Sequence, residues 1–155
     1  MKYFSIVVAV LALALPTFAE AKDIVAKDPQ TIAQFFDEEG VAYDVTTDDV
    51  GDPNISVNYY GNEFSIYFYG CTDNTRCDAI QFFSGYQTDG SVRLSKINDW
   101  NTENRFGRAY VSDEGSARIE LDVFLGNDGM SADDFAELLG IWSRLVQDFE
   151  TLIDW

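Results

Sequence analysis

The last part of the chain has the clearest hydrophobic pattern. Apolar residues recur every three or four positions between Ser131 and Ile153, which predicts one amphipathic helix of about six turns that covers a core. Ser131 to Asp134 form a capping box with aspartate in place of the usual glutamate, so the helix should begin there. The apolar stripe consists of Phe135, Leu138, Leu139, Trp142, Leu145, Val146, Phe149, Leu152 and Ile153.

Two shorter helices are predicted earlier in the chain. The first has Asp28 as its N-cap, Pro29 in its first turn and Gly40 as its end, because aspartate accepts from free backbone N–H groups and glycine tolerates a left-handed conformation. The second should run from about Ser91 to Asn101. Their apolar stripes are Ile32, Phe35 and Phe36 in the first helix, and Leu94, Ile97, Asn98 and Asn101 in the second.

Alternating apolar and polar residues predict the strands between these helices. Gly61-Asn62 should form the turn of one hairpin, and Asp113 to Gly115 the turn of another. The predicted fold is α+β, an antiparallel sheet with packed helices in the order α-β-β-β-β-α-β-β-α, with one face of the sheet covered. The strands are residues 41–45, 54–60, 63–69, 79–85, 106–111 and 117–125.

The first residues have a different pattern, which predicts a signal peptide over residues 1–21. Lys2 precedes an uncharged run from Tyr3 to Leu15 that is shorter than the ~20 residues of a membrane span. Small residues then allow cleavage after Ala19 or after Ala21. We expect a periplasmic or secreted protein made of a single domain, residues 22–155, with no membrane attachment after cleavage.

Export changes the interpretation of the two cysteines in GCTDNTRCD (70–78). They could form a disulfide, a metal site or a reaction centre. An oxidising compartment favours a disulfide, and zinc needs about four ligands whereas this sequence offers two cysteines and no histidine. We therefore predict a disulfide between Cys71 and Cys77.

The net charge of −17 limits the possible partners. An acidic surface repels phosphate backbones and anionic lipids, so we expect neither nucleic acid nor a membrane surface as a partner. The acidic segments 48–52 and 126–129 do not match the ligand spacing of an EF-hand. The sequence predicts no metal and no cofactor.

Six blocks of sequence, taken in order, resemble the YbjN-domain family over nearly all of residues 22–155, with INDWN followed by RFGRAY as the most specific pair. The resemblance implies a fold similar to that of type III secretion chaperones and a family described as bacterial sensory transduction regulators. It implies no catalytic residues. The blocks are GDPNISV (51–57), FSIYFYGC (64–71), CDAIQFF (77–83), INDWN (97–101), RFGRAYVSDEG (105–115) and SADDFAELLGIWSRLVQDFETLI (131–153).

The polar residues of these blocks could bind a ligand or could support the fold. Asn98 and Asn101 are expected to bond to nearby backbone, and Trp100 to fill core volume, because buried polar groups are usually paired. Arg105 and Arg108 could hold a carboxylate of a ligand. The preferred interpretation pairs Arg108 with an acid across its hairpin.

Strand alternation gives one candidate partner surface. If Ile55, Phe64 and Ile66 face the core, then Tyr60, Tyr67 and Tyr69 face the opposite side. Tyrosine is common at interfaces, although cross-strand aromatic pairs also stabilise sheets. Both interpretations stay open at this point.

The sequence offers little for catalysis. Without histidine, and with both cysteines oxidised, the usual nucleophile and base pairs are missing, which leaves carboxylate pairs. We expect a non-enzymatic chaperone-like or regulatory adaptor that binds another polypeptide. A small carboxylate-dependent envelope hydrolase is the alternative, and a homodimer stays open.

Overall fold

A computed structural model of the protein describes residues 23–155, and the predicted signal peptide and its cleavage sites lie outside these residues. The helices are α1 (Gln30–Glu39), α2 (Leu94–Glu103) and α3 (Ala132–Ile153). The strands are β1 (Asp23–Ile24), β2 (Ala42–Thr47), β3 (Pro53–Tyr59), β4 (Asn62–Tyr69), β5 (Ala79–Tyr86), β6 (Arg108–Val111), β7 (Ala117–Phe124) and β8 (Met130–Ser131).

Six of these strands form one antiparallel sheet in the order β2-β3-β4-β5-β7-β6. The predicted class and the predicted order of the main elements are confirmed. The prediction missed β1 and β8, which pair with each other over two residues each. Strands this short are below the length at which alternation can be recognised.

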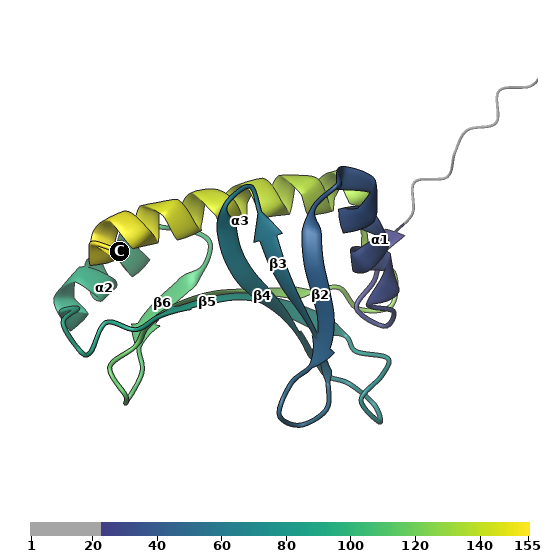
Figure 1. The fold of residues 1–155 in the computed structure, drawn as a ribbon, viewed down its shortest axis with the longest axis horizontal. Helices are drawn as coiled ribbons and strands as arrows, with labels where there is room; N and C mark the ends of the chain where they lie inside the picture. The colour runs from purple at the N-terminus through teal and green to yellow at the C-terminus, as the bar shows by residue number, and fades with distance from the viewer. Residues whose placement is uncertain (1–22) are drawn as a thin grey trace, which may run out of the picture.

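The helices lie along one side of the curved sheet (Figure 1). α3 runs across it, α1 lies at the β2 end and α2 at the β6 end. Trp142 is fully buried in the centre of α3, with its ring 5.9 Å from that of Phe64 and 5.7 Å from that of Phe82. These contacts bury the inner face of the sheet, and the other face stays open.

Local capping explains where the helices begin and end. The N-cap of α1 is Pro29, one residue later than predicted, and the carboxylate of the preceding Asp28 accepts a 3.1 Å hydrogen bond from the N–H of Gln30. Gly40 ends α1 at a φ of 67°. The hydroxyl of Ser131 accepts from the N–H of Asp134 at 3.1 Å, as the capping box predicts. Lys96 of α2 donates to the last-turn carbonyl of Leu152 at 3.1 Å, where the negative end of the helix dipole favours a cation.

The predicted α2 was partly wrong. The helix begins at Leu94 rather than near Ser91, and Leu94 is 71% exposed. Asn98 and Asn101 are exposed as well, so neither shares the buried stripe. Ile97 and Trp100 are the buried residues of α2, because a helix at the end of the sheet needs to bury only a narrow face.

The turn of the first hairpin is one residue earlier than predicted. Tyr59 pairs with Asn62, and the turn residues are Tyr60 and Gly61 with φ values of 50° and 91°. Two positive φ values are typical of a type I′ turn, whose twist matches that of the strands. Asn58 supports the turn by accepting from the N–H of Gly61 at 3.3 Å.

Candidate functional site: the open face of the sheet

The pairing register identifies the side chains on the open face. Alternation puts Ile66, Phe82 and Leu121 on the covered face, since all are buried and paired in one row. The residues between them therefore project from the other side. Three neighbouring rows on that side are Tyr67, Gln81 and Asp122; Ser65, Phe83, Glu120 and Arg108; and Tyr69, Ala79 and Phe124.

Four aromatic side chains, Tyr67, Tyr69, Phe83 and Phe124, make up what we call the aromatic patch. Tyr67 and Phe83 pack edge to face with ring centroids 5.6 Å apart. Tyr69 is 46% exposed and Phe124 is 79% exposed, while the Tyr69 hydroxyl donates to Gln81 Oε1 at 3.3 Å. The patch combines a fixed part with two rings that remain accessible.

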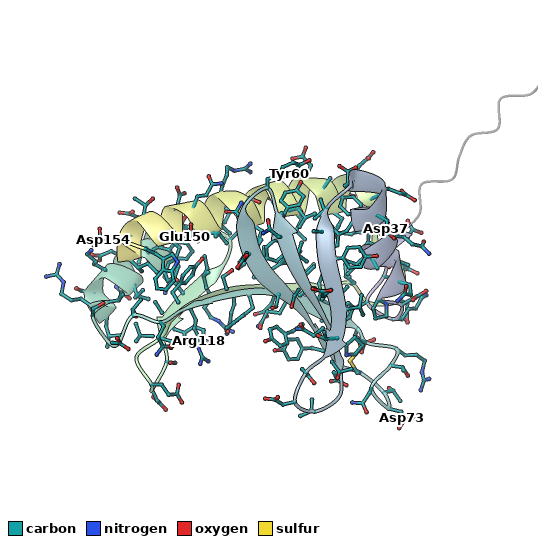
Figure 2. The ribbon with its side chains drawn as sticks, in the orientation of Figure 1. Asp37, Tyr60, Asp73, Arg118, Glu150 and Asp154 are labelled. Atoms are coloured by element: carbon teal, nitrogen blue, oxygen red, sulfur yellow. A yellow bond between two sulfur atoms is a disulfide. The ribbon has the colours of Figure 1, made fainter. Side chains whose placement is uncertain are left out.

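The aromatic patch differs from the predicted tyrosine surface at two points. Tyr60 does not belong to it, because Tyr60 lies in the hairpin turn, 77% exposed, with its ring 4.7 Å from that of Tyr59 (Figure 2). Phe83 and Phe124 were missed. Alternation could have found both, because Phe83 follows the buried Phe82, and Phe124 continues the outward series of Glu120 and Asp122.

A charged network lies beside the aromatic patch. Glu120 is only 5% exposed although it projects from the open face. Its carboxylate accepts from the Arg108 guanidinium and the Tyr110 hydroxyl in short contacts. The Gln81 amide donates to Asp122 Oδ1 at 2.6 Å and to Glu120 Oε2 at 3.4 Å. These donors replace the water that a buried carboxylate would lose.

The network also changes the acidity of its members. The hydrogen bond to Glu120 raises the pKa of Arg108. Burial raises the pKa of the Tyr110 hydroxyl, and its hydrogen bond to Glu120 adds to this effect. Arg108 therefore pairs with the acid directly opposite it in the β6–β7 hairpin, as the preferred sequence interpretation expected. Arg105 is exposed, and the structure gives no reason for its presence.

A hollow of about 660 Å³ lies on the same face over β2 to β5. Small side chains of Ser56, Ser65 and Gly85 line it together with Phe83 of the aromatic patch. Asp44 and Glu63 also line it. The hollow thus adjoins the aromatic patch, and no basic side chain is among its lining residues.

The cysteine loop lies between β4 and β5. Cys71 and Cys77 form a disulfide, as predicted. Within the loop, Asn74 Nδ2 donates to the carbonyl of Val50 at 3.0 Å and to the carboxylate of Asp52 at 2.8 Å. The loop is thereby tied to the acidic connection between β2 and β3.

That acidic connection is held by turn chemistry. Asp48 Oδ1 accepts from the N–H groups of Val50 and Asp52 at 3.0 and 2.9 Å. Within residues 23–155, no three His, Cys, Asp or Glu side chains come together in a way that could hold a metal ion. In the same range, no helix combines the length and apolar character needed to cross a membrane.

Comparison with known proteins identifies the family. The model of the YbjN family, described as "Putative bacterial sensory transduction regulator", matches residues 28–155. The chain belongs to the YbjN family. Among curated proteins, none matches the sequence of this YbjN chain significantly.

Two solved structures are similar to the YbjN chain. One is a protein from Methanothermobacter thermautotrophicus, with a TM-score of 0.58 and 17% identity over 81% of this chain and 96% of that one. The other is the Yersinia pestis type III secretion chaperone SycH, solved in complex with a stable fragment of YscM2. It has a TM-score of 0.43 and 15% identity over 77% of this chain and 94% of that one. At these identities the likeness concerns the fold alone.

Two residues of the INDWN block connect elements of this YbjN chain. Asn101 Nδ2 donates to the carbonyl of Ala109 at 3.0 Å, and Asn101 Oδ1 accepts from the Ala109 N–H at 2.9 Å. Trp100 is buried, with its ring 5.6 Å from that of Phe149. Asn101 and Trp100 thus join α2 to β6 and to α3, whereas Asn98 lies exposed on α2.

Proposed function

We propose that this YbjN chain is an exported, non-enzymatic protein that binds another polypeptide through the open face of its sheet. The observation that carries the proposal is the aromatic patch, in which Tyr69 and Phe124 remain exposed beside a fixed pair, Tyr67 and Phe83. Aromatic side chains on rigid elements contribute most of the energy in many interfaces, because they bury a large area and lose little rotational freedom.

Export is supported by the disulfide and by the pattern of the first residues. Cys71 and Cys77 are paired, and a disulfide persists in an oxidising compartment such as the periplasm. Lys2 followed by the uncharged run from Tyr3 to Leu15 is typical of a signal peptide. Both observations agree with a periplasmic or secreted protein.

The geometry of the Glu120–Asp122 pair favours a structural role over carboxylate hydrolysis. A pair of catalytic carboxylates must face each other across space for a substrate. Glu120 and Asp122 come from one strand, and the Gln81 amide donates to both. Arg108 and Tyr110 also donate hydrogen bonds to Glu120. The two carboxylates therefore leave no room between them for a scissile bond.

Photo-crosslinking in cells tests the proposal. The full chain carries a photoreactive amino acid at Phe83, and crosslinked partners are recovered from the periplasmic fraction. Tyr69→Ser/Phe124→Ser should reduce the crosslinked partner by about tenfold or more, since loss of two aromatic anchors typically costs a few kcal/mol of binding. Its thermal stability should change little, because exposed side chains contribute little to folding.

Tyr60→Ser/Leu94→Ser is the matched control, because both residues are more than 70% exposed and neither belongs to the open face. It should keep the wild-type crosslinking yield. Equal yields from both double variants would remove the open face as the binding surface. Absence of the chain from the periplasmic fraction would contradict export. If the crosslinked partner were a second copy of this chain, the open face would be a homodimer interface and the adaptor proposal would be wrong.

A further inference from the structure

The hollow over β2 to β5 adds chemical specificity to the open face. We infer that it receives a lysine or arginine side chain of the bound polypeptide, an inference that rests on the proposed function. Three properties of the hollow lead to this ligand: its shape, its charge and the aromatic ring in its wall.

The shape comes from small side chains at adjacent positions of the sheet. Ser56 pairs with Ser65, and Ser65 with Phe83, so two serines lie beside one large ring. Gly85 keeps the adjoining space open. A Cβ atom built on Gly85 would lie 3.2 Å from Cζ of Phe83, tighter than ordinary van der Waals contact. The whole hollow has a volume of about 660 Å³, which is enough for a long side chain.

The charge of this region is negative. Asp44 and Glu63 line the hollow, and both are exposed. The chain from Asp37 to Thr75, which includes β2, β3 and β4, contains no lysine and no arginine. A cation entering the hollow would therefore meet two carboxylates and no basic group from these strands.

One arginine lies near the hollow but is already engaged. Arg118 of β7 pairs with Gly85 across the sheet. Its guanidinium lies 3.7 Å from the Glu114 carboxylate and 6.0 Å from the ring of Tyr110. Arg118 is thus directed to the β6–β7 hairpin. Glu63 Oε1 accepts from the Asn58 amide at 3.4 Å, and no basic side chain of the described residues forms an ion pair with Asp44 or Glu63.

The third property is the half-buried ring of Phe83. The methylene groups of lysine and arginine pack well on apolar surface while their charged ends reach polar groups. Phe83 offers that surface, and Asp44 and Glu63 offer acceptors for the charged end. If a second copy of this chain bound here through the same region, the acids in residues 37–75 of the two copies would face each other. Like-charge repulsion therefore disfavours a second copy as the occupant.

Peptide binding measured by fluorescence anisotropy tests the inference. The probes are three labelled nine-residue peptides in which threonine alternates with lysine, serine or glutamate. The full mature chain should bind the lysine peptide at least about tenfold more tightly than the serine peptide, and the glutamate peptide least. Asp44→Asn/Glu63→Gln should weaken lysine-peptide binding by about fivefold or more, the loss expected for two partly exposed ion pairs.

Glu137→Gln/Asp148→Asn is the matched control, since it removes the same charge from exposed positions of α3. It should change the affinity by less than about twofold, which is the effect left to distant screened charges. Equal weakening by the two variants, or no preference for the lysine peptide, overturns the inference. The proposed function is judged separately, because the crosslinking loss in Tyr69→Ser/Phe124→Ser does not depend on Asp44 or Glu63.

Discussion

Glu120 is nearly buried although it projects from the uncovered face of the sheet. Its cover consists of polar side chains, Arg108, Tyr110 and Gln81, that donate to its carboxylate. Removal of one partner from such a pair leaves a buried charge without compensation, which usually costs more than the intact pair contributes. The network therefore holds β6 in one position against β7. It makes this end of the open face rigid, at the side away from the hollow.

Tyr86 should make the stability of the protein depend on pH. It is buried, and its hydroxyl donates to Glu150 Oε1 at 3.0 Å. Burial, followed by the negative charge of Glu150, raises the pKa of Tyr86 above the ordinary value of 10.0. The folded protein thus holds this proton more tightly than the unfolded chain does. The resulting stabilisation is complete below the unfolded pKa of about 10 and is lost as the pH rises above it.

Tyr86→Phe should therefore lower the free energy of unfolding at pH 7 by about 1 kcal/mol, the usual net value of a hydrogen bond. Between about pH 10 and 11 its stability should fall less steeply than that of the wild type. Urea unfolding followed at several pH values measures both effects. The other tyrosines are present in both proteins, so the difference isolates Tyr86. Parallel pH profiles would show that the Tyr86 proton does not stabilise the fold.

At the scale of elements, the disulfide loop supports its neighbour. Cys71→Ser/Cys77→Ser should lower the free energy of unfolding by about 2 kcal/mol. The effect is modest because a disulfide that closes a short loop removes little entropy from the unfolded chain. It should also speed amide exchange at Val50 and Asp52, because Asn74 bonds to both residues from within the loop. Hydrogen exchange read by NMR measures this local effect.

Asn74→Ala separates the two contributions of the loop. It keeps the disulfide and removes the bonds to Val50 and Asp52, so exchange should increase there with a smaller loss of global stability. Unchanged exchange in both variants would mean that Asp48, which accepts from the N–H groups of the same two residues, holds the connection without help from the loop.

The sequence predicted the elements best where many residues repeat one pattern. The stripe of α3 and the alternation of β7 were each specified by several side chains, so the helix, the strand and the covered face of the sheet followed. α2 was less well defined, because only Ile97 and Trp100 are buried along it. The turn at Tyr60 was misplaced, since a tyrosine with a positive φ has no signal in local sequence preferences.

The candidate site was predictable only in part. Alternation indicated Tyr67 and Tyr69, and the same rule applied to β5 and β7 would have added Phe83 and Phe124. The hollow and the Glu120 network were beyond the sequence, because both depend on register across strands that are distant in the chain. Ser56 and Phe83, for example, meet through Ser65 of β4.

At the scale of the whole molecule, charge is unevenly distributed. The net charge is −17, and the strands β2 to β4 carry acids without a single lysine or arginine. Five of the basic residues lie from the N-cap of α2 through β7, namely Arg93, Lys96, Arg105, Arg108 and Arg118. The β2 end of the sheet is therefore the more negative end, and repulsion between its acids opposes folding.

Added salt should stabilise the protein for this reason. The screening length falls from ~30 Å at 0.01 M salt to below ~8 Å at 0.3 M, which weakens repulsion between exposed acids. The melting temperature should rise by about 3–5 °C over this range, equivalent to roughly 1 kcal/mol. Scanning calorimetry in sodium chloride measures it, with sucrose of equal osmolality as the control. A melting temperature that is constant or falls with salt would show that ion pairs outweigh the repulsion.

The bond pair between Asn101 and Ala109 has a consequence for sheet growth. β6 is an edge strand, and edge strands expose backbone groups on which further chains can assemble into aggregates. The amide of Asn101 presents one donor and one acceptor to Ala109, as a neighbouring strand would. α2 thereby occupies the β6 edge at Ala109, and this hinders the addition of further copies at that position, the step that leads to fibres.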